Sequence, residues 1–495
     1  MHREVDSTSA LKVRFTLRRI GWPAASVALA ATVFAIERGV DTLGIAVAYK
    51  AKMLCSGVFV VGRGEQDVLR ELEIDDLAPL RFIGTSVDHS EGVARASALG
   101  IVRREAASRG ATGCAIVPRG MTRSEFRQGS SRDSVELWER KPAEPLPEVA
   151  PDDTIRRALD SILERAFAEP DSQRPRRTQA IVIIHKGRVV AERYAPGIGP
   201  ETRLLGWSMT KSVMNALVGI LVRDGRLSLD SPVPLPAWRN PGDPRGAITL
   251  KQLLQMTSGL RFDEGMASTR SDVIRMLLQS DDMADFAADR ALEAPPGSRW
   301  EYASGTSVLI ASVIRHVLND DQAYVRFPRE ALFDRIGMNS AVIETDAAGT
   351  FVGSSLMYAT ARDWARFGQL YLNDGLWNGE RILPEGWVDY TRIPVSVDPN
   401  RGYGAHFWLG TPADPGEPVG GLPEGALQAA GHESQFVAVL PSHDAVVVRL
   451  GRTRLPDAWD QAAFLEAVLA VLPRREARLF PIPQDAHMLT GMTHR

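Results

Sequence analysis

The stretch "LLGWSMTKSVMNALVGILVRDGRLSLD", residues 204–230, decides the fold of this chain. Its middle is apolar on every side, which predicts a buried helix that ends at Asp224–Gly225. A lysine, Lys211, nevertheless lies in the first turn of that helix, although only seven of the 495 residues are lysines. Residues i and i+3 share one face of a helix, so we expect Lys211 to contact Ser208.

The pairing of Ser208 with Lys211 indicates a reactive serine. Burial disfavours the charged form of a lysine, and a neutral amine can take the proton of a serine hydroxyl. The start of the helix adds a positive dipole end beside the alkoxide that forms. Ser-x-x-Lys alone is a weak signal, because it also occurs at Ser9–Lys12, and a lysine at a helix start can equally extend to solvent.

Two further stretches carry candidate site residues. In "PPGSRWEYASGTSVLIASVI", residues 295–314, a Pro-Gly turn leads to Tyr302 in a loop before a second apolar helix, where a phenol can project into a cleft. In "AAGHESQFVAVLP", residues 429–441, a turn of small residues leads into a strand that is expected to line a cleft. Another tyrosine, Tyr371, begins a Tyr-x-Asn string. It lies within an amphipathic helix, so we expect it to pack in the core.

With these three pieces in this order, the chain resembles the serine β-lactamase and penicillin-binding-protein superfamily. It is most similar to the class C-like branch, which includes carboxylesterases and 6-aminohexanoate-dimer hydrolases. "WSMTKS" resembles the nucleophile motif, "YAS" the tyrosine motif, and "GHESQ" stands where that branch has a Lys-Thr-Gly or His-x-Gly strand. The resemblance covers about residues 150–475. It implies an α+β fold in which an antiparallel sheet flanked by helices lies beside a helical lobe.

The resemblance also implies roles for individual residues. Ser208 would be the acylated nucleophile, Lys211 its general base and Tyr302 a proton relay. The backbone N–H groups of Ser208 and Gln435 would form the oxyanion hole. The implied reaction is cleavage of a small-molecule ester or amide through an acyl-serine, which water then hydrolyses. We expect no cofactor and no metal, because the nine histidines form no HExxH or paired-ligand pattern.

Departures from the family motifs bear on the substrate. Ser304 replaces the asparagine of Tyr-x-Asn, His432 replaces the lysine of Lys-Thr-Gly, and Ser434 takes the glycine position. A permanent cation for a substrate carboxylate is therefore missing, since histidine is only partly charged at neutral pH. These changes favour neutral esters or amides. Candidate substrate contacts are His432, Ser304, Ser434 and Trp207, although His432 could instead have a local partner and Trp207 could be a core residue.

Alternative functions remain open at this point. A β-lactamase or D,D-peptidase-like activity is one, and a non-catalytic binding or sensor homologue is another. An α/β-hydrolase is disfavoured, because no serine lies in a G-x-S-x-G elbow. Asp263 and Glu264 lie on a loop near the expected cleft, and we expect them to be surface charges.

Composition divides the chain into five parts. We expect residues 1–40 to form a signal peptide or membrane anchor, 41–140 a small α+β region, 141–153 a linker rich in proline and acid, 154–475 the hydrolase domain and 476–495 a polar tail. The formal net charge of −3 gives no indication of a nucleic-acid partner. Oligomeric state does not follow from the sequence.

The N-terminal part predicts export. Four basic residues in 12–19 precede an uncharged run at residues 20–36, which is near the minimum length that spans a bilayer. A signal peptide cleaved after Ala30, an inner-membrane anchor and a buried helix are all compatible with it. The first two place the rest of the chain outside the cytoplasm, in the periplasm. No other segment is expected to span a membrane. A disulfide between Cys55 and Cys114 is then permitted and slightly favoured over two buried thiols.

Overall fold

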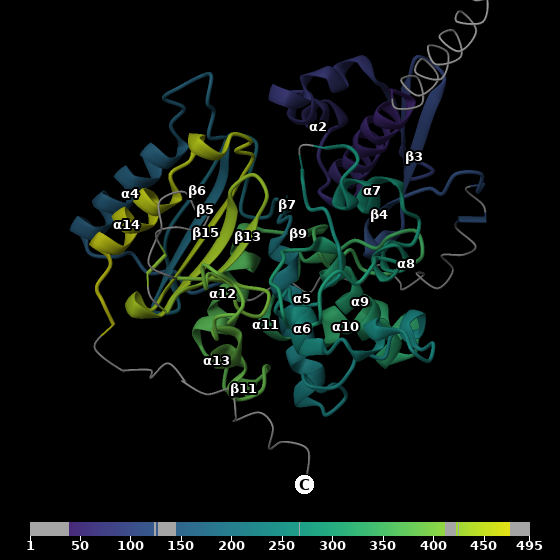
Figure 1. Ribbon diagram of the computed structural model, residues 1–495. Helices are drawn as coiled ribbons and strands as arrows, with labels where there is room; N and C mark the ends of the chain where they lie inside the picture. Colours follow the sequence, from purple (N-terminus) through teal and green to yellow (C-terminus); the bar gives the residue numbers. More distant parts are fainter. Residues whose placement is uncertain are drawn as a thin grey trace, which may run out of the picture.

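The computed structural model describes residues 39–122, 125–126, 145–266, 268–410, 422–423 and 425–475. The apolar run at residues 20–36, most of the predicted linker and the tail lie outside the described residues, so the predicted domain boundaries remain predictions. The described chain has the α+β, β-lactamase-like architecture expected from the sequence, with a small α+β unit formed by its N-terminal part (Figure 1).

A six-stranded antiparallel sheet forms one side of the molecule, in the order β12-β13-β14-β15-β5-β6. Runs of β-branched residues such as "IVII" and "VVV" favour these strands. The C-terminal strand β15 pairs with β5, with Val447 opposite Ile183, so segments far apart in sequence lie side by side. The strands are β5 (Thr178–His185), β6 (Arg188–Tyr194), β12 (Trp408–Leu409), β13 (Leu427–Gly431), β14 (Gln435–Leu440) and β15 (Ala445–Gly451).

Helices cover both faces of this sheet. Side chains of successive strand residues point to opposite faces, so Val447 packs with α4 (Asp153–Phe167) and α14 (Gln461–Val471). Its neighbours Val446 and Val448 belong to the main core, which contains α12 (Ala361–Leu372). Asp152 caps α4 by accepting a hydrogen bond from the Thr154 N–H at 2.8 Å. Figure 1 shows α4 and α14 together on the outer face of the sheet.

The helical lobe lies on the other side of α5 (Met209–Arg223), the helix predicted from the opening stretch. Residues 209–221 are all buried, as their apolar composition predicts. The larger helices of the lobe are α7 (Asp272–Gln279), α9 (Ser304–Leu318) and α10 (Asp321–Pro328). Shorter elements are α6 (Leu250–Leu254), α8 (Met283–Ala288), α11 (Asp334–Ile336), α13 (Trp387–Thr391), β7 (Leu204–Leu205), β8 (Val342–Ile343), β9 (Met357–Ala359), β10 (Leu376–Trp377) and β11 (Glu380–Arg381).

The N-terminal unit, defined here as residues 39–122, packs a long helix, Gly39–Val60, on a four-stranded antiparallel sheet. Val47, Ala51 and Leu54 of the helix share a core with alanines of the sheet. A disulfide joins Cys55 to Cys114, as the sequence slightly favoured. The remaining elements are α2 (Glu65–Leu72), β1 (Gly84–Asp88), β2 (Val93–Ala98), β3 (Val102–Ser108) and β4 (Cys114–Ile116).

The helix Gly39–Val60 corrects one expectation. By length and composition alone this helix could cross a membrane. The expectation that no segment other than residues 20–36 qualifies is therefore wrong. Yet 67% of its most apolar window is buried within the protein. A helix that covers a sheet in this way is a core helix of the fold.

A buried ion pair joins the N-terminal unit to the rest of the protein. The Lys52 ammonium contacts the Glu344 carboxylate, whose side chain is completely buried. Ser56 Oγ and the Cys114 backbone N–H also donate to Glu344, each at 2.8 Å. Gly113 permits this approach: its φ is +71°, and a Cβ there would lie 2.5 Å from the Glu344 side chain.

Candidate active site

The start of α5 presents Ser208 to a pocket. Gly206 lies against Trp364, where an added Cβ would be 2.5 Å from the indole ring. Trp207 then adopts a left-handed backbone with a φ of +49°. Ser208 follows as the N-cap residue, and its side chain makes no capping hydrogen bond. Its backbone N–H has no hydrogen-bond acceptor among the described residues. Both polar groups of Ser208 are therefore available to a ligand.

Lys211 lies beneath Ser208 and does not reach solvent, since the residue is only 2% exposed. Its Nζ donates to Ser208 Oγ at 3.1 Å, to Ser304 Oγ at 3.1 Å and to the Ser354 carbonyl at 3.0 Å. No acidic side chain in the described ranges forms an ion pair with it. The contact expected from the i and i+3 spacing is thus present, and no carboxylate in the described ranges touches the amine directly.

Tyr302 lies beside the lysine, in the loop before α9. Its ring centroid is 4.8 Å from the Lys211 Nζ. The ring stacks on Trp408, with centroids 5.6 Å apart, and meets the Tyr403 ring edge-on. Tyr371, by contrast, is buried and donates its hydroxyl to Asn215 at 2.5 Å. Tyr302 therefore lies in the wall of a pocket, whereas Tyr371 lies in the core.

The turn between β13 and β14 forms the opposite wall. Gly431 approaches the nucleophile segment so closely that an added Cβ would lie 2.2 Å from the Gly206 carbonyl oxygen. The His432 ring meets the Trp207 indole edge-on, with centroids 5.7 Å apart. This aromatic contact is a local partner for His432, which the sequence left open. Gln435 begins β14 directly after the turn.

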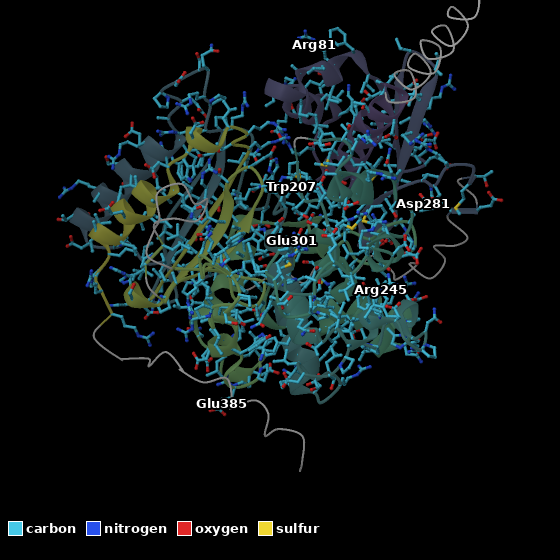
Figure 2. The ribbon with its side chains drawn as sticks, viewed as in Figure 1. Arg81, Trp207, Arg245, Asp281, Glu301 and Glu385 are labelled. Atoms are coloured by element: carbon cyan, nitrogen blue, oxygen red, sulfur yellow. A yellow bond between two sulfur atoms is a disulfide. The ribbon has the colours of Figure 1, made fainter. Side chains whose placement is uncertain are left out.

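One pocket, about 430 Å³ in volume, brings the candidate residues together. Figure 2 places Trp207 near the centre of the molecule, between the six-stranded sheet and the helical lobe. Lys211 lies beneath the pocket. The walls of the pocket also contain Glu264, Ser355, Trp408 and Arg454, which the motifs did not predict as site residues. The predicted residues in its lining are Trp207, Ser208, Tyr302, Ser304, His432, Ser434 and Gln435.

Glu264 is not the surface charge that the sequence suggested. Its carboxylate accepts hydrogen bonds from the Ser304 backbone N–H at 2.7 Å and from Ser304 Oγ at 2.5 Å. Ser304 Oγ in turn accepts from Lys211 Nζ. The serine at the family's asparagine position thus links the lysine to a carboxylate. The contact between Glu264 and Ser304 joins residues 40 positions apart, and no local sequence pattern predicts it.

The described residues offer no cluster of side chains that could bind a metal ion. No group of three or more histidine, cysteine, aspartate or glutamate side chains within the described ranges is placed to bind an ion. The chemistry that the pocket offers is that of a hydroxyl, an amine and a phenol.

His406 supports α5 from below. Its Nδ1 lies 2.7 Å from the Leu254 carbonyl and its Nε2 lies 2.9 Å from Ser307 Oγ. Its own carbonyl accepts from Ser212 Oγ on α5 at 2.7 Å. Complete burial lowers the pKa of His406 from 6.5 to about 3. The imidazole is therefore neutral, with Nδ1 donating to the carbonyl and Nε2 accepting from the serine.

This burial makes stability depend on pH. Because the pKa is lower in the folded state, the contribution is complete above pH 6.5 and is lost as the pH falls towards about 3. Between about pH 6.5 and 4.5 we expect the free energy of unfolding to fall by roughly 2–3 kcal/mol through this group. His406→Gln should have a flatter dependence in urea unfolding at several pH values. Equal slopes for the two proteins would contradict the assignment.

The fold and the pocket define the class: a β-lactamase-fold serine hydrolase, with a serine at the start of a helix above a buried lysine and a strand edge opposite. The model of the Beta-lactamase family matches residues 163–470, and the chain belongs to that family. The N-terminal unit precedes the matched region.

Individual proteins of known name are similar to this chain in sequence or in fold. The chain is 24% identical over 352 residues to the 6-aminohexanoate-dimer hydrolase of Paenarthrobacter ureafaciens, covering 67% of this chain and 85% of that protein. A penicillin-binding protein homolog from Caulobacter crescentus has a similar fold, with a TM-score of 0.50, 20% identity and coverage of 66% and 100%. EstCE1, a hydrolase with promiscuous acyltransferase activity, has a TM-score of 0.50, 15% identity and coverage of 65% and 98%.

Proposed function

We propose that this protein hydrolyses small esters or amides through an acyl-serine intermediate on Ser208. The observation that carries the proposal is the position of Lys211, whose buried amine donates to the serine hydroxyl at 3.1 Å and forms no direct ion pair among the described residues. In its neutral form this amine is a base in hydrogen-bonding reach of the proton that it must remove. A buried lysine without a direct ion pair does not stabilise the fold by packing, because burying an ammonium costs free energy.

In acylation, Ser208 Oγ attacks the substrate carbonyl while its proton passes to Lys211. The negative oxygen that forms is bound by the N–H groups of Ser208 and Gln435, which stabilises the tetrahedral state. Tyr302, beside the ammonium, relays a proton to the leaving alcohol or amine. Water then attacks the acyl-serine, with the same groups returning the proton to Ser208 Oγ.

The pocket favours uncharged acyl groups. Position 432 carries a histidine packed on Trp207, and Arg454 is occupied by an ion pair with Glu433 at 2.8 Å. Neither is a free, permanent cation for a substrate carboxylate. The aromatic rings of Tyr302 and Trp408 instead supply apolar surface. These features argue for esters or amides over β-lactams and peptide carboxylates.

We also propose that the enzyme works outside the cytoplasm, in the periplasm, with residues 20–36 as its signal peptide or inner-membrane anchor. The Cys55–Cys114 disulfide supports this location, because disulfides persist in oxidising compartments.

A substrate comparison tests the function. We expect turnover of short-chain p-nitrophenyl esters, little hydrolysis of nitrocefin, and loss of both ester turnover and fluorophosphonate labelling in Ser208→Ala. Faster nitrocefin than ester hydrolysis would favour the β-lactamase alternative. An intact protein that takes no label and turns over neither substrate would favour a non-catalytic homologue.

A further inference from the structure

Glu433 occupies an unusual place in the turn between β13 and β14. Its backbone φ is +65°, and that of Ser434 is +59°. This left-handed conformation is uncommon for residues other than glycine and asparagine, and costs free energy unless the surroundings hold it. The side chain of Glu433 is only 3% exposed. A buried carboxylate on a strained turn requires specific partners.

Its partners lie on the nucleophile segment and on the segment that follows β15. Glu433 Oε2 accepts from the Trp207 indole N–H at 3.3 Å. Its Oε1 accepts from Arg454 at 2.8 Å, and Arg452 Nε lies 3.7 Å from the carboxylate. Trp207 also has a left-handed backbone, with a φ of +49°. One carboxylate therefore connects two strained backbone segments.

These two segments carry the proposed oxyanion hole. The Ser208 N–H comes directly after Trp207, and the Gln435 N–H comes two residues after Glu433. The separation of the two donors must be fixed in advance, since a donor stabilises the transition state only where it already points at the oxyanion. The bond from Glu433 to the Trp207 indole crosses between the segments, as does the backbone approach of Gly431 to Gly206.

A chain of ion pairs continues from this carboxylate into the N-terminal unit. Arg452 also contacts Glu71 of α2 at 3.1 Å. Glu71 is paired with Arg63 at 2.6 Å and lies 3.4 Å from the Gln179 amide of β5. In Figure 1, α2 lies near the end of the sheet that it contacts through these residues. The family match begins at residue 163, so this support comes from outside the matched domain.

We propose that Glu433 is a positioning residue that sets the spacing of the oxyanion hole, and that the N-terminal unit holds Glu433 in place through Glu71 and Arg452. The inference rests on the proposed function. Within the described residues, the hydrogen bonds and ion pairs of the Glu433 side chain are with Trp207, Arg452 and Arg454 and not with Ser208 or Lys211, so it acts through Trp207 and the turn. The N-terminal unit is accordingly part of the catalytic structure.

The test uses the full chain with substitutions that preserve shape. Glu433→Gln should lower kcat for a p-nitrophenyl ester about 10-fold, with KM changed less than about twofold, and should weaken binding of an aryl boronic acid, a tetrahedral anionic mimic, by a similar factor. Trp207→Phe should give a comparable loss, and the double variant should lose little more than either single one. Glu71→Gln should lower kcat about threefold.

Glu105→Gln is the matched control, because it removes an ion pair with Arg95 at 3.1 Å within the same unit and should leave kcat unchanged. Rates are to be divided by the concentration of active sites titrated with fluorophosphonate, so that loss of folded protein is not counted. A Glu433→Gln protein with unaltered kcat and boronic acid affinity would overturn the proposal, and so would additive losses in the double variant. Full activity of Ser208→Ala would instead refute the underlying function.

Discussion

Replacing Lys211 with alanine is expected to slow ester hydrolysis by about 10²–10⁴-fold, the usual contribution of a positioned general base. Among the described residues, the Lys211 amine is the one group that forms a hydrogen bond with Ser208 Oγ, at 3.1 Å. Its loss removes the proton acceptor for acylation and leaves the Ser304 hydroxyl and the Ser354 carbonyl without their buried donor. The first effect acts on the acylation step and the second on the stability of the fold.

Pre-steady-state acylation by a p-nitrophenyl ester measures this step directly. Lys251→Ala, in the short helix α6, is the control for removing a lysine elsewhere in the lobe. Thermal unfolding should accompany the kinetics, since Lys211 is buried. A folded Lys211→Ala protein that acylates at a near-normal rate would exclude this residue as the base.

The second large effect is expected for Gly431→Ala, with kcat lowered by about 10²–10³-fold, as when one oxyanion-hole donor is lost. The new Cβ would lie 2.2 Å from the Gly206 carbonyl oxygen. That neighbour is backbone, so it cannot rotate away as a side chain would, and the two segments must separate. The N–H of Gln435 then moves away from that of Ser208.

Gly199→Ala is the matched control, because an added Cβ there meets no atom within 4 Å. We expect it to leave kcat unchanged. Circular dichroism and active-site titration establish that the Gly431→Ala protein is folded. Wild-type kcat in such a protein would show that the close approach of the two segments has no part in catalysis.

The sequence predicted those site residues that short motifs carry. Ser208 and Lys211 were placed together by helical spacing, and Tyr302 by its loop before an apolar helix. The order of three motifs then indicated the sheet and the helical lobe. The pairing of β15 with β5 was not predicted, because it joins segments more than 200 residues apart and no local pattern in the residues indicates it.

Contacts between distant residues escaped prediction for the same reason. Glu264 meets Ser304 across 40 residues, and Glu433 meets Trp207 across 226. Neither acidic residue lies at a spacing that reports its partner. The N-terminal helix was missed for a different reason: lysines at positions 50 and 52 interrupt its apolar pattern, yet both are buried and paired in the fold.

The ion pair between Lys52 and Glu344 has a consequence for how this protein can be subdivided. A chain shortened to begin near residue 150 would lose the Lys52 ammonium and the Ser56 and Cys114 donors of Glu344, and it would uncover the face of the hydrolase domain on which they pack. The N-terminal unit is thus no detachable module. In homologues that begin at the hydrolase domain, no counterpart of Lys52 is present, so position 344 should face solvent or carry an uncharged residue.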